Sequence, residues 1–171
     1  MKHALSHKGF TFIELILYVS ISAVMLLAIL AFLSSLLQSR IKNQTIAEVE
    51  QQGLQAMHMI TQAVRNASAI GTPAQGASAA VLSVGTIAAG NDPTVFDLAG
   101  GVIRMKEGAG DAVPLTNSRI IGSALAFQNL SRASTPGTVR IQFTLAHRNP
   151  EGRNEYSFSR VFIGSATLRQ P

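Results

Sequence analysis

The stretch Lys8-Gly9-Phe10-Thr11-Phe12-Ile13-Glu14 stands directly before a run of 23 uncharged residues, Leu15–Leu37. A helix of that length and apolar character is long enough to cross a hydrocarbon core of about 30 Å. Glu14 is the only charged residue from Gly9 to Leu37. An ionised carboxylate that faces lipid costs roughly a few kcal/mol, so such a residue needs a partner. We therefore expect a membrane-spanning helix that carries one functional charge.

Two ordinary explanations of an N-terminal apolar run fit this chain poorly. A secretory signal peptide is cleaved after its apolar part, where Ala28-Ile29-Leu30-Ala31 is a poor small-x-small site. A plain signal anchor explains the length of the run but leaves Glu14 and the Gly9-Phe10 junction unexplained. The basic residues on the two sides of the run nearly balance, so they do not fix its orientation. The size and polarity of the C-terminal part favour its translocation, with the short leader left in the cytoplasm.

The charged residues outside this region indicate a solvated surface. The net charge of +5 becomes 5 − 2 = +3 when residues 1–9 are removed, because Lys2 and Lys8 leave with them. The arginines of the C-terminal part are scattered from Arg104 to Arg169 without a run, so we do not expect nucleic acid as a partner. The chain has no cysteine, which excludes disulfides and thiolate metal sites.

The helix is expected to continue beyond the apolar run, over residues 38–70. This segment has no proline, and small or apolar residues recur every three or four positions, which places them on one face of a helix. These residues are Ile46, Val49, Gly53, Ala56, Met57, Ile60, Ala63, Val64 and Ala67. Gly71-Thr72-Pro73 supplies a stop, since glycine accepts the left-handed capping conformation and proline cannot continue a helix. The first half of the helix is therefore apolar all round, and the second half is amphipathic.

Residues 71–171 are expected to form a β-rich domain. After a loop from Gly71 to Ala80, short runs rich in β-branched and aromatic residues alternate with turn signals. The expected strands are Val81–Val84, Thr94–Leu98, Val102–Met105, Arg119–Ile121, Ala124–Phe127, Val139–Leu145 and Tyr156–Phe162, with the last two forming a hairpin. The pattern indicates an α+β fold, in which an antiparallel sheet packs on the amphipathic half of a long N-terminal helix.

The N-terminal residues resemble the processing signature of type IV prepilins and type II secretion pseudopilins. That signature is a short basic leader ending in glycine, then phenylalanine or methionine, a small polar residue, two apolar residues and glutamate. Here these are Lys8-Gly9, Phe10, Thr11, Phe12-Ile13 and Glu14. Many major pilins carry a helix-kinking proline where this chain has Ala31, so a straighter helix is expected.

Later segments are similar to minor subunits of the J-type pseudopilin and W-type minor pilin groups. They are Gln51-Gln52-Gly53 and Val64-Arg65-Asn66-Ala67 in the helix, Leu115–Ile120 leading into Leu125-Ala126-Phe127, and the closing segment Tyr156–Phe162. The resemblance implies a pilin fold with four parts. These are a leader peptide at residues 1–9, a transmembrane and filament-core helix at 10–37, its amphipathic continuation at 38–70, and a globular pilin domain at 71–171.

The resemblance also implies how the chain is processed and assembled. A cytoplasm-facing prepilin peptidase would cut between Gly9 and Phe10, and the new amine of Phe10 would be methylated. Glu14 would then pair with the terminal amine of a neighbouring subunit, because a buried ion pair costs far less than either charge alone. The implied location is the bacterial inner membrane, crossed once, with the C-terminal domain periplasmic or extracellular. The implied partners are other minor and major pilins or pseudopilins, the prepilin peptidase, the inner-membrane assembly platform and membrane lipid before assembly.

No residue pattern predicts a catalytic, cofactor or metal site. His58 and His147 have no second ligand at a usual spacing and are better explained as structural histidines. Asp92, Asp97 and Asp111 could supply oxygen ligands to calcium, as loops of some pseudopilins do, but they form no ligand pattern. We therefore expect a structural subunit of a secretion pseudopilus or type IV pilus. The alternatives are a DNA-uptake or adhesive minor pilin, and a membrane-anchored enzyme tethered by the helix.

Overall fold

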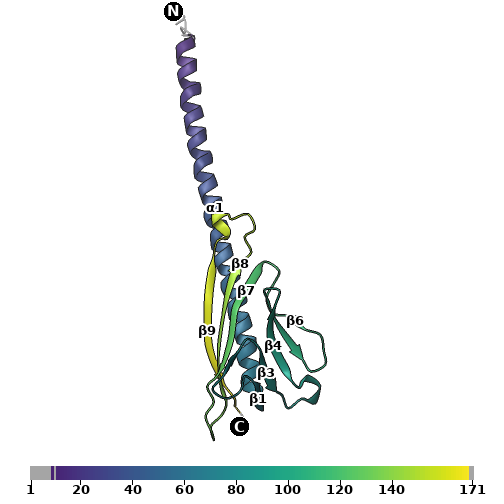
Figure 1. Ribbon diagram of the computed structural model, residues 1–171. Coiled ribbons are helices and arrows are strands. Elements are labelled where there is room, and N and C mark those ends of the chain that lie inside the picture. Colours follow the sequence, from purple (N-terminus) through teal and green to yellow (C-terminus); the bar gives the residue numbers. More distant parts are fainter. Residues whose placement is uncertain (1–8, 10, 170–171) are drawn as a thin grey trace, which may run out of the picture. The chain divides into compact units, whose positions relative to one another are not determined.

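The computed structural model describes residues 9 and 11–169 of the chain. Phe10, where cleavage and methylation are expected, and leader residues 1–8 lie outside the described residues. The protein is α+β, with one long helix, α1 (Phe12–Asn66), followed by antiparallel strands (Figure 1). The chain divides into two compact units, Met1–Arg40 and Ile41–Pro171, and α1 contributes to both.

The first unit contains the apolar part of α1. Thr11 caps its N-terminus: the hydroxyl of Thr11 accepts from the backbone N–H of Glu14 at 3.3 Å, and its carbonyl accepts from the N–H of Leu15 at 3.2 Å. The hydroxyl of Ser20 donates to the carbonyl of Ile16 at 2.8 Å, so this polar group is satisfied within the helix. By its length and composition, α1 is a candidate for crossing a membrane.

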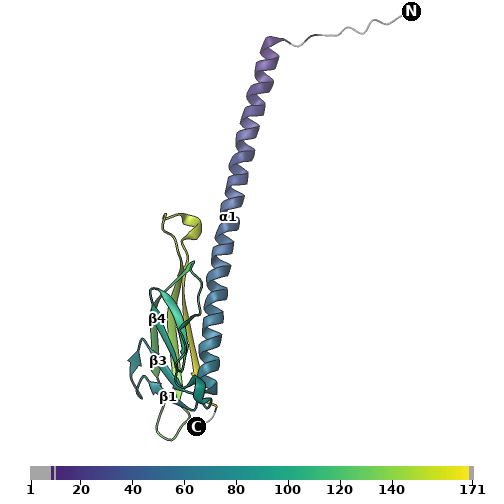
Figure 2. The same cartoon turned by 90° about the vertical axis from the view of Figure 1, so that its right-hand side faces the viewer.

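The second unit packs the rest of α1 against two sheets. One sheet has the strand order β1-β3-β4-β5-β6 and the other β2-β7-β8-β9. The bounds are β1 Ala69–Thr72, β2 Ser78–Ala79, β3 Leu82–Gly85, β4 Thr94–Ala99, β5 Val102–Glu107, β6 Val113–Pro114, β7 Ile120–Asn129, β8 Thr138–His147 and β9 Ser159–Thr167, with short 3-10 turns η1 Ala89–Asn91 and η2 Asn154–Tyr156. Figure 2 shows the strands gathered on one side of this part of the helix.

The stripe predicted on the helix is the face that packs on the strands. The buried residues of α1 recur at helical spacing: Thr45, Val49, Gly53, Ala56, Ile60 and Val64. They share one core with inward-facing residues of the strands, among them Val139, Ile141, Phe143 and Leu145 of β8, each fully buried. The predicted alternation of buried and exposed side chains along β8 is confirmed, and one side of this strand faces the core. Arg140, between two of these positions, is exposed.

The predicted end of the helix was wrong by four residues. The helix ends at Asn66, and Ala69–Thr72 forms β1 in place of the last helical turn and the Gly71-Thr72-Pro73 stop. Ser68 shows why, because both its N–H and its hydroxyl donate to the carbonyl of Gly85, at 2.9 Å and 3.1 Å. Pairing with β3 satisfies these groups better than a fraying helix end does.

Further details of the strands differ from the prediction. The loop predicted from Gly71 to Ala80 contains the short strand β2, which pairs with β7, and the short strand β6 was not predicted. The strands form two sheets, where one was expected. The runs Arg119–Ile121 and Ala124–Phe127 belong to one strand, β7, which is interrupted by a bulge at Ala124 with φ 51°. The last strand begins at Ser159, because residues before it form η2. The hairpin of the last two strands is confirmed by the pairing of β8 with β9.

Candidate functional site

The largest candidate interface is the apolar surface of α1 in the first unit. Residues 15–40 are all exposed, including every large apolar side chain of the run. Monomeric soluble proteins rarely expose contiguous apolar patches above a few hundred Å². The uncovered surface runs round the whole helix, so it requires lipid or protein on all sides.

Glu14 lies in the first turn of this helix and is partly exposed. The helix dipole favours a carboxylate at this position, and the cap from Thr11 fixes the turn that carries it. Within residues 11–169 the carboxylate of Glu14 forms no ion pair. Burial of this carboxylate in lipid or protein would require a counter-charge or protonation.

A second site is an open groove in the other unit, with a volume of about 680 Å³. One wall is the start of the unit's helical part, from Ile41 to Glu48. The other walls are the segment just before β7 and the loop after β8, including Arg119, His147 and Arg148. The helical wall lies at least 118 − 48 = 70 positions before the other walls in sequence, so the groove exists only in the folded unit.

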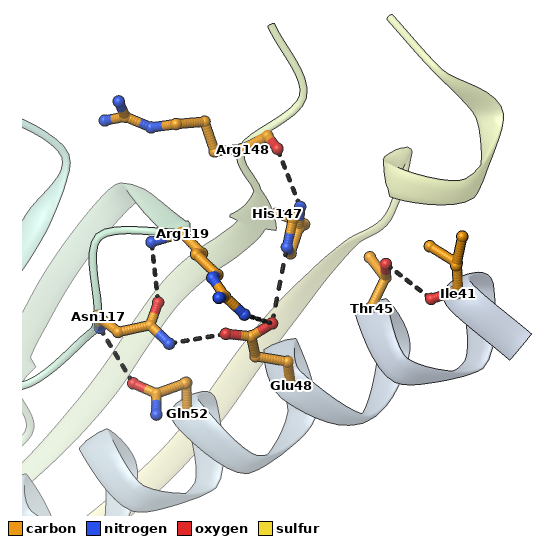
Figure 3. A network of polar contacts seen from close by, with 8 residues as sticks. All are labelled: Ile41, Thr45, Glu48, Gln52, Asn117, Arg119, His147 and Arg148. Atoms are coloured by element: carbon orange, nitrogen blue, oxygen red, sulfur yellow. Dashed lines mark hydrogen bonds and ion pairs between the residues drawn. The ribbon is translucent and has the colours of Figure 1, made fainter. Parts of the chain in front are cut away.

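Glu48 is the centre of a polar network in this groove (Figure 3). Its carboxylate accepts from the side-chain amide of Asn117 at 2.8 Å and lies 4.0 Å from the guanidinium of Arg119. Asn117 is itself fixed, because its backbone N–H donates to Gln52 at 3.2 Å and its side-chain oxygen accepts from the N–H of Arg119 at 3.0 Å. The network ties the segment before β7 to α1 and offsets the charge of Glu48.

His147 joins the same network from the end of β8. Its Nδ1 donates to the carbonyl of Arg148 at 2.9 Å, and its Nε2 lies 3.7 Å from the carboxylate of Glu48. The ring also stacks on Tyr156, with centroids 5.3 Å apart. Both ring nitrogens are therefore directed at protein groups, the carbonyl of Arg148 and the carboxylate of Glu48.

The loop after β8 is held against α1 by Lys42. Its ammonium donates to the carbonyls of Asn154 at 2.9 Å and Ser157 at 2.8 Å. Beside them the guanidinium of Arg153 lies 2.7 Å from Glu155. The pKa of Glu155 is lowered, first by a hydrogen bond from its own backbone N–H and then by the hydrogen bond from Arg153. The hydrogen bond that Arg153 donates to Glu155 in turn raises the pKa of Arg153.

The residues considered for calcium are not brought together. The guanidinium of Arg104 on β5 donates two hydrogen bonds to the carboxylate of Asp97 on β4, at 2.9 Å and 2.6 Å. Hydrogen bonding to Asp97 raises the pKa of Arg104. Asp92 accepts from the N–H of Thr86 at 3.0 Å. Asp111 is exposed. The described part of the chain contains no group of three or more histidine, aspartate or glutamate side chains placed to hold a metal.

Sequence reasoning missed the Glu48 network and treated His147 as isolated. The sequence pattern predicted no role for Glu48 and no partner for His147. No local signal links positions about 100 residues apart, because their meeting depends on how β8 packs on α1. His58, by contrast, is exposed on the helix.

Comparisons of the chain with protein-family models, with curated proteins and with solved structures find no match.

Proposed function

We propose that this chain is a minor subunit of a type II secretion pseudopilus or a type IV pilus. The observation that carries the proposal is the arrangement in the first unit. An apolar helix surface is uncovered on all sides, and one carboxylate stands in its first turn, five residues after Gly9. A filament core supplies what this surface lacks, because identical or similar helices cover each other there.

Processing would create the missing counter-charge. Cutting the Gly9-Phe10 bond leaves an ammonium on Phe10, four residues before Glu14. In an apolar core an unpaired ammonium or carboxylate is strongly unfavourable, whereas a pair is far less so. A subunit that leaves the bilayer would satisfy its Glu14 with the amine of a neighbour, and this pairing would set the axial position of one subunit on the next.

The second unit supports the same proposal. Its amphipathic helical part already has a partner, since Val49, Ala56, Ile60 and Val64 are fully buried against the strands. The chain covers the C-terminal half of α1 with its own strands and leaves the apolar N-terminal half exposed. Such a helix is suited to assembly with other subunits through its exposed half. The domain would lie outside the inner membrane and at the filament surface.

The alternatives receive less support. A nucleic-acid face needs many clustered free cations, and three arginines of the second unit, Arg104, Arg153 and Arg160, are each paired with a carboxylate of the same unit. A tethered enzyme needs a reactive group directed into a pocket, and the ring nitrogens of His147 are directed elsewhere.

The experiment compares Glu14→Ala with the matched variant Ser20→Ala, which also changes a polar group on the apolar helix. Both variants should enter the membrane and resist alkaline extraction as the unchanged chain does. Only Glu14→Ala should fail to co-purify with sheared filaments. The mature chain should also have the mass of residues 10–171 plus one methyl group. Normal incorporation of Glu14→Ala, or an unprocessed N-terminus in the filament, would refute the proposal.

A further inference from the structure

The edge strands of the two sheets differ in length. β1 and β6 form the edges of one sheet, and β2 and β9 form the edges of the other. β1, β2 and β6 have two to four residues, whereas β9 has nine. Natural sheets protect a long edge with a bulge, a proline or a lysine. β9 has none of these, because it pairs with β8 without a register shift and its sequence contains neither residue.

The outer edge of β9 carries backbone groups that its own sheet does not use. The N–H of His147 donates to the carbonyl of Phe158 at 3.0 Å, and the N–H of Leu168 donates to the carbonyl of Gly137 at 2.8 Å. Residues of an antiparallel strand alternate between bonding to the partner strand and facing away from it. The even-numbered residues of β9 therefore bond to β8, and the odd-numbered residues direct their N–H and carbonyl groups outward. These are Ser159, Val161, Ile163, Ser165 and Thr167, and no hydrogen bond from another described residue reaches their backbone groups.

This edge borders an uncovered part of α1. Glu50 of the helix pairs with Arg160 of β9. Further along the helix, the side chain of Met57 lies against Gly164 of β9. Leu54 is four residues after Glu50 and three before Met57, so it lies on the same side of the helix. Leu54 is nonetheless 65% exposed. A strand added beyond β9 would lie about 4.8 Å further out, and its inward side chains would reach Leu54.

The outer face of the same sheet offers one cation. Arg140 is exposed between buried residues of β8, and it lies opposite Ser165 of β9. With Leu130, Ile163 and Ser165 it lines an open hollow of about 440 Å³. The four strands of this sheet contain no aspartate or glutamate, and Arg140 forms no ion pair within the described part of the chain. Because Ser165 is small, the guanidinium can extend across it toward a carboxylate on an added strand.

We propose that β9 accepts an extended segment of a different protein as a fifth strand of this sheet. The segment would carry apolar side chains on its inner face, toward Leu54, and a carboxylate on its outer face, beside Ser165. The free backbone groups select an extended conformation, and Arg140 selects the carboxylate. A second copy of this chain does not meet both demands, because pairing of two β9 edges brings no carboxylate to Arg140.

The test uses the full-length chain in detergent micelles and a fluorescein-labelled peptide, Lys-Val-Thr-Leu-Glu-Val-Thr-Lys. When this peptide is extended, its valines and leucine share one face and its glutamate lies on the other. Fluorescence anisotropy should show saturable binding. A matched peptide with glutamine in place of the glutamate should bind about threefold to fivefold more weakly. Absence of saturable binding of the first peptide would overturn the inference.

Side-chain variants locate the binding site. Leu54→Lys should weaken binding by about fivefold or more, because an ammonium would lie under the apolar face of the peptide. Gln55→Lys is the matched control. Gln55 lies three residues after Gln52, which bonds to the segment before β7, so the same charge is added on the other side of the helix. It should leave binding unchanged, and equal effects of the two variants would contradict the proposed position.

Arg140→Gln tests the carboxylate contact. It should remove the difference in affinity between the glutamate and glutamine peptides, because the two changes delete the same ion pair. Arg132→Gln, which removes an exposed arginine from the loop after β7, should leave that difference in place. A difference that survives Arg140→Gln would show that Arg140 does not select the peptide.

The backbone contact is tested at Ser165. Its N–H points outward, so Ser165→Pro removes a donor of the edge and spares the ladder with β8. Binding should fall by about fivefold or more. In the unchanged chain, hydrogen exchange read by NMR should show protection of the Val161 and Ile163 amides rising about tenfold or more when the peptide is added. Exchange at these amides that does not respond to the peptide would overturn the inference.

A final outcome concerns a second copy of the chain. A dimer in micelles that Ser165→Pro abolishes would assign the edge to self-association and overturn the inference. The inference goes beyond the proposed function and does not depend on it, since every residue used lies in the second unit. Loss of peptide binding therefore leaves the filament proposal intact, and failure of the Glu14 experiment leaves the edge of β9 intact.

Discussion

Gly53 provides the sharpest test of how α1 meets the strands. It is the only glycine in α1 and is buried. A Cβ added there would overlap the ring of Phe162 on β9. Phe143 stacks against that ring with centroids 5.3 Å apart, which limits how far the ring can move aside. The close approach of helix and strand therefore requires glycine at this position.

The expected magnitude follows from two opposing effects. Overpacking costs about 1–3 kcal/mol, and the backing by Phe143 places this site near the upper end. Alanine regains about 1 kcal/mol of helix propensity over glycine. Gly53→Ala should therefore lower the free energy of unfolding by about 2 kcal/mol. In a Phe162→Ala background the ring is gone, so the same change should stabilise by about 1 kcal/mol, giving a coupling energy of about 3 kcal/mol.

The assay is urea denaturation of the full-length chain in detergent micelles, followed by tyrosine fluorescence. The chain has no tryptophan, and Tyr156, stacked on His147, is the only tyrosine of the second unit. The exposed helix variant Gln55→Ala serves as control and should stay within about 0.5 kcal/mol of the unchanged chain. An equal penalty for Gly53→Ala in both backgrounds would refute the reasoning, since it would show that Phe162 is not the obstacle.

Two further predictions concern the second unit. Asn129→Ala should cost about 2–3 kcal/mol of unfolding free energy, because the buried amide donates to the carbonyl of Pro73 at 2.8 Å and its removal leaves that carbonyl unpaired. Gln75→Ala, which loses only an exposed bond to the carbonyl of Ser131, should cost less than half as much in the same urea titration, and equal costs would contradict the burial argument. The lowered pKa of Glu155 means that its contribution to stability is present above the ordinary value of 4.5 and is lost as pH falls through the lower folded value. Urea midpoints measured from pH 7 downward should therefore fall less steeply below that value in Glu155→Gln than in the unchanged chain, and parallel curves would exclude this role.

The sequence alone predicted the structural elements whose patterns depend on residues close together in the chain. Twenty-three uncharged residues predict a long apolar helix, because each residue adds its own preference for lipid or protein over water. The stripe at Val49, Ala56 and Ile60 and the alternation in β8 predict buried faces, since the period of a regular backbone fixes where side chains point. The lone charge of Glu14 is also visible without a structure.

The tertiary structure alone decided the remaining features. Ser68 leaves the helix because Gly85 is placed to accept its hydrogen bonds. Gly53 is required because Phe162 lies over it, and neither residue predicts the other. Glu48, Asn117 and His147 form one network although they lie far apart in the chain. The physical reason is common to all three: local preferences depend on neighbours in sequence, whereas these contacts form only after loop closure has brought distant segments together.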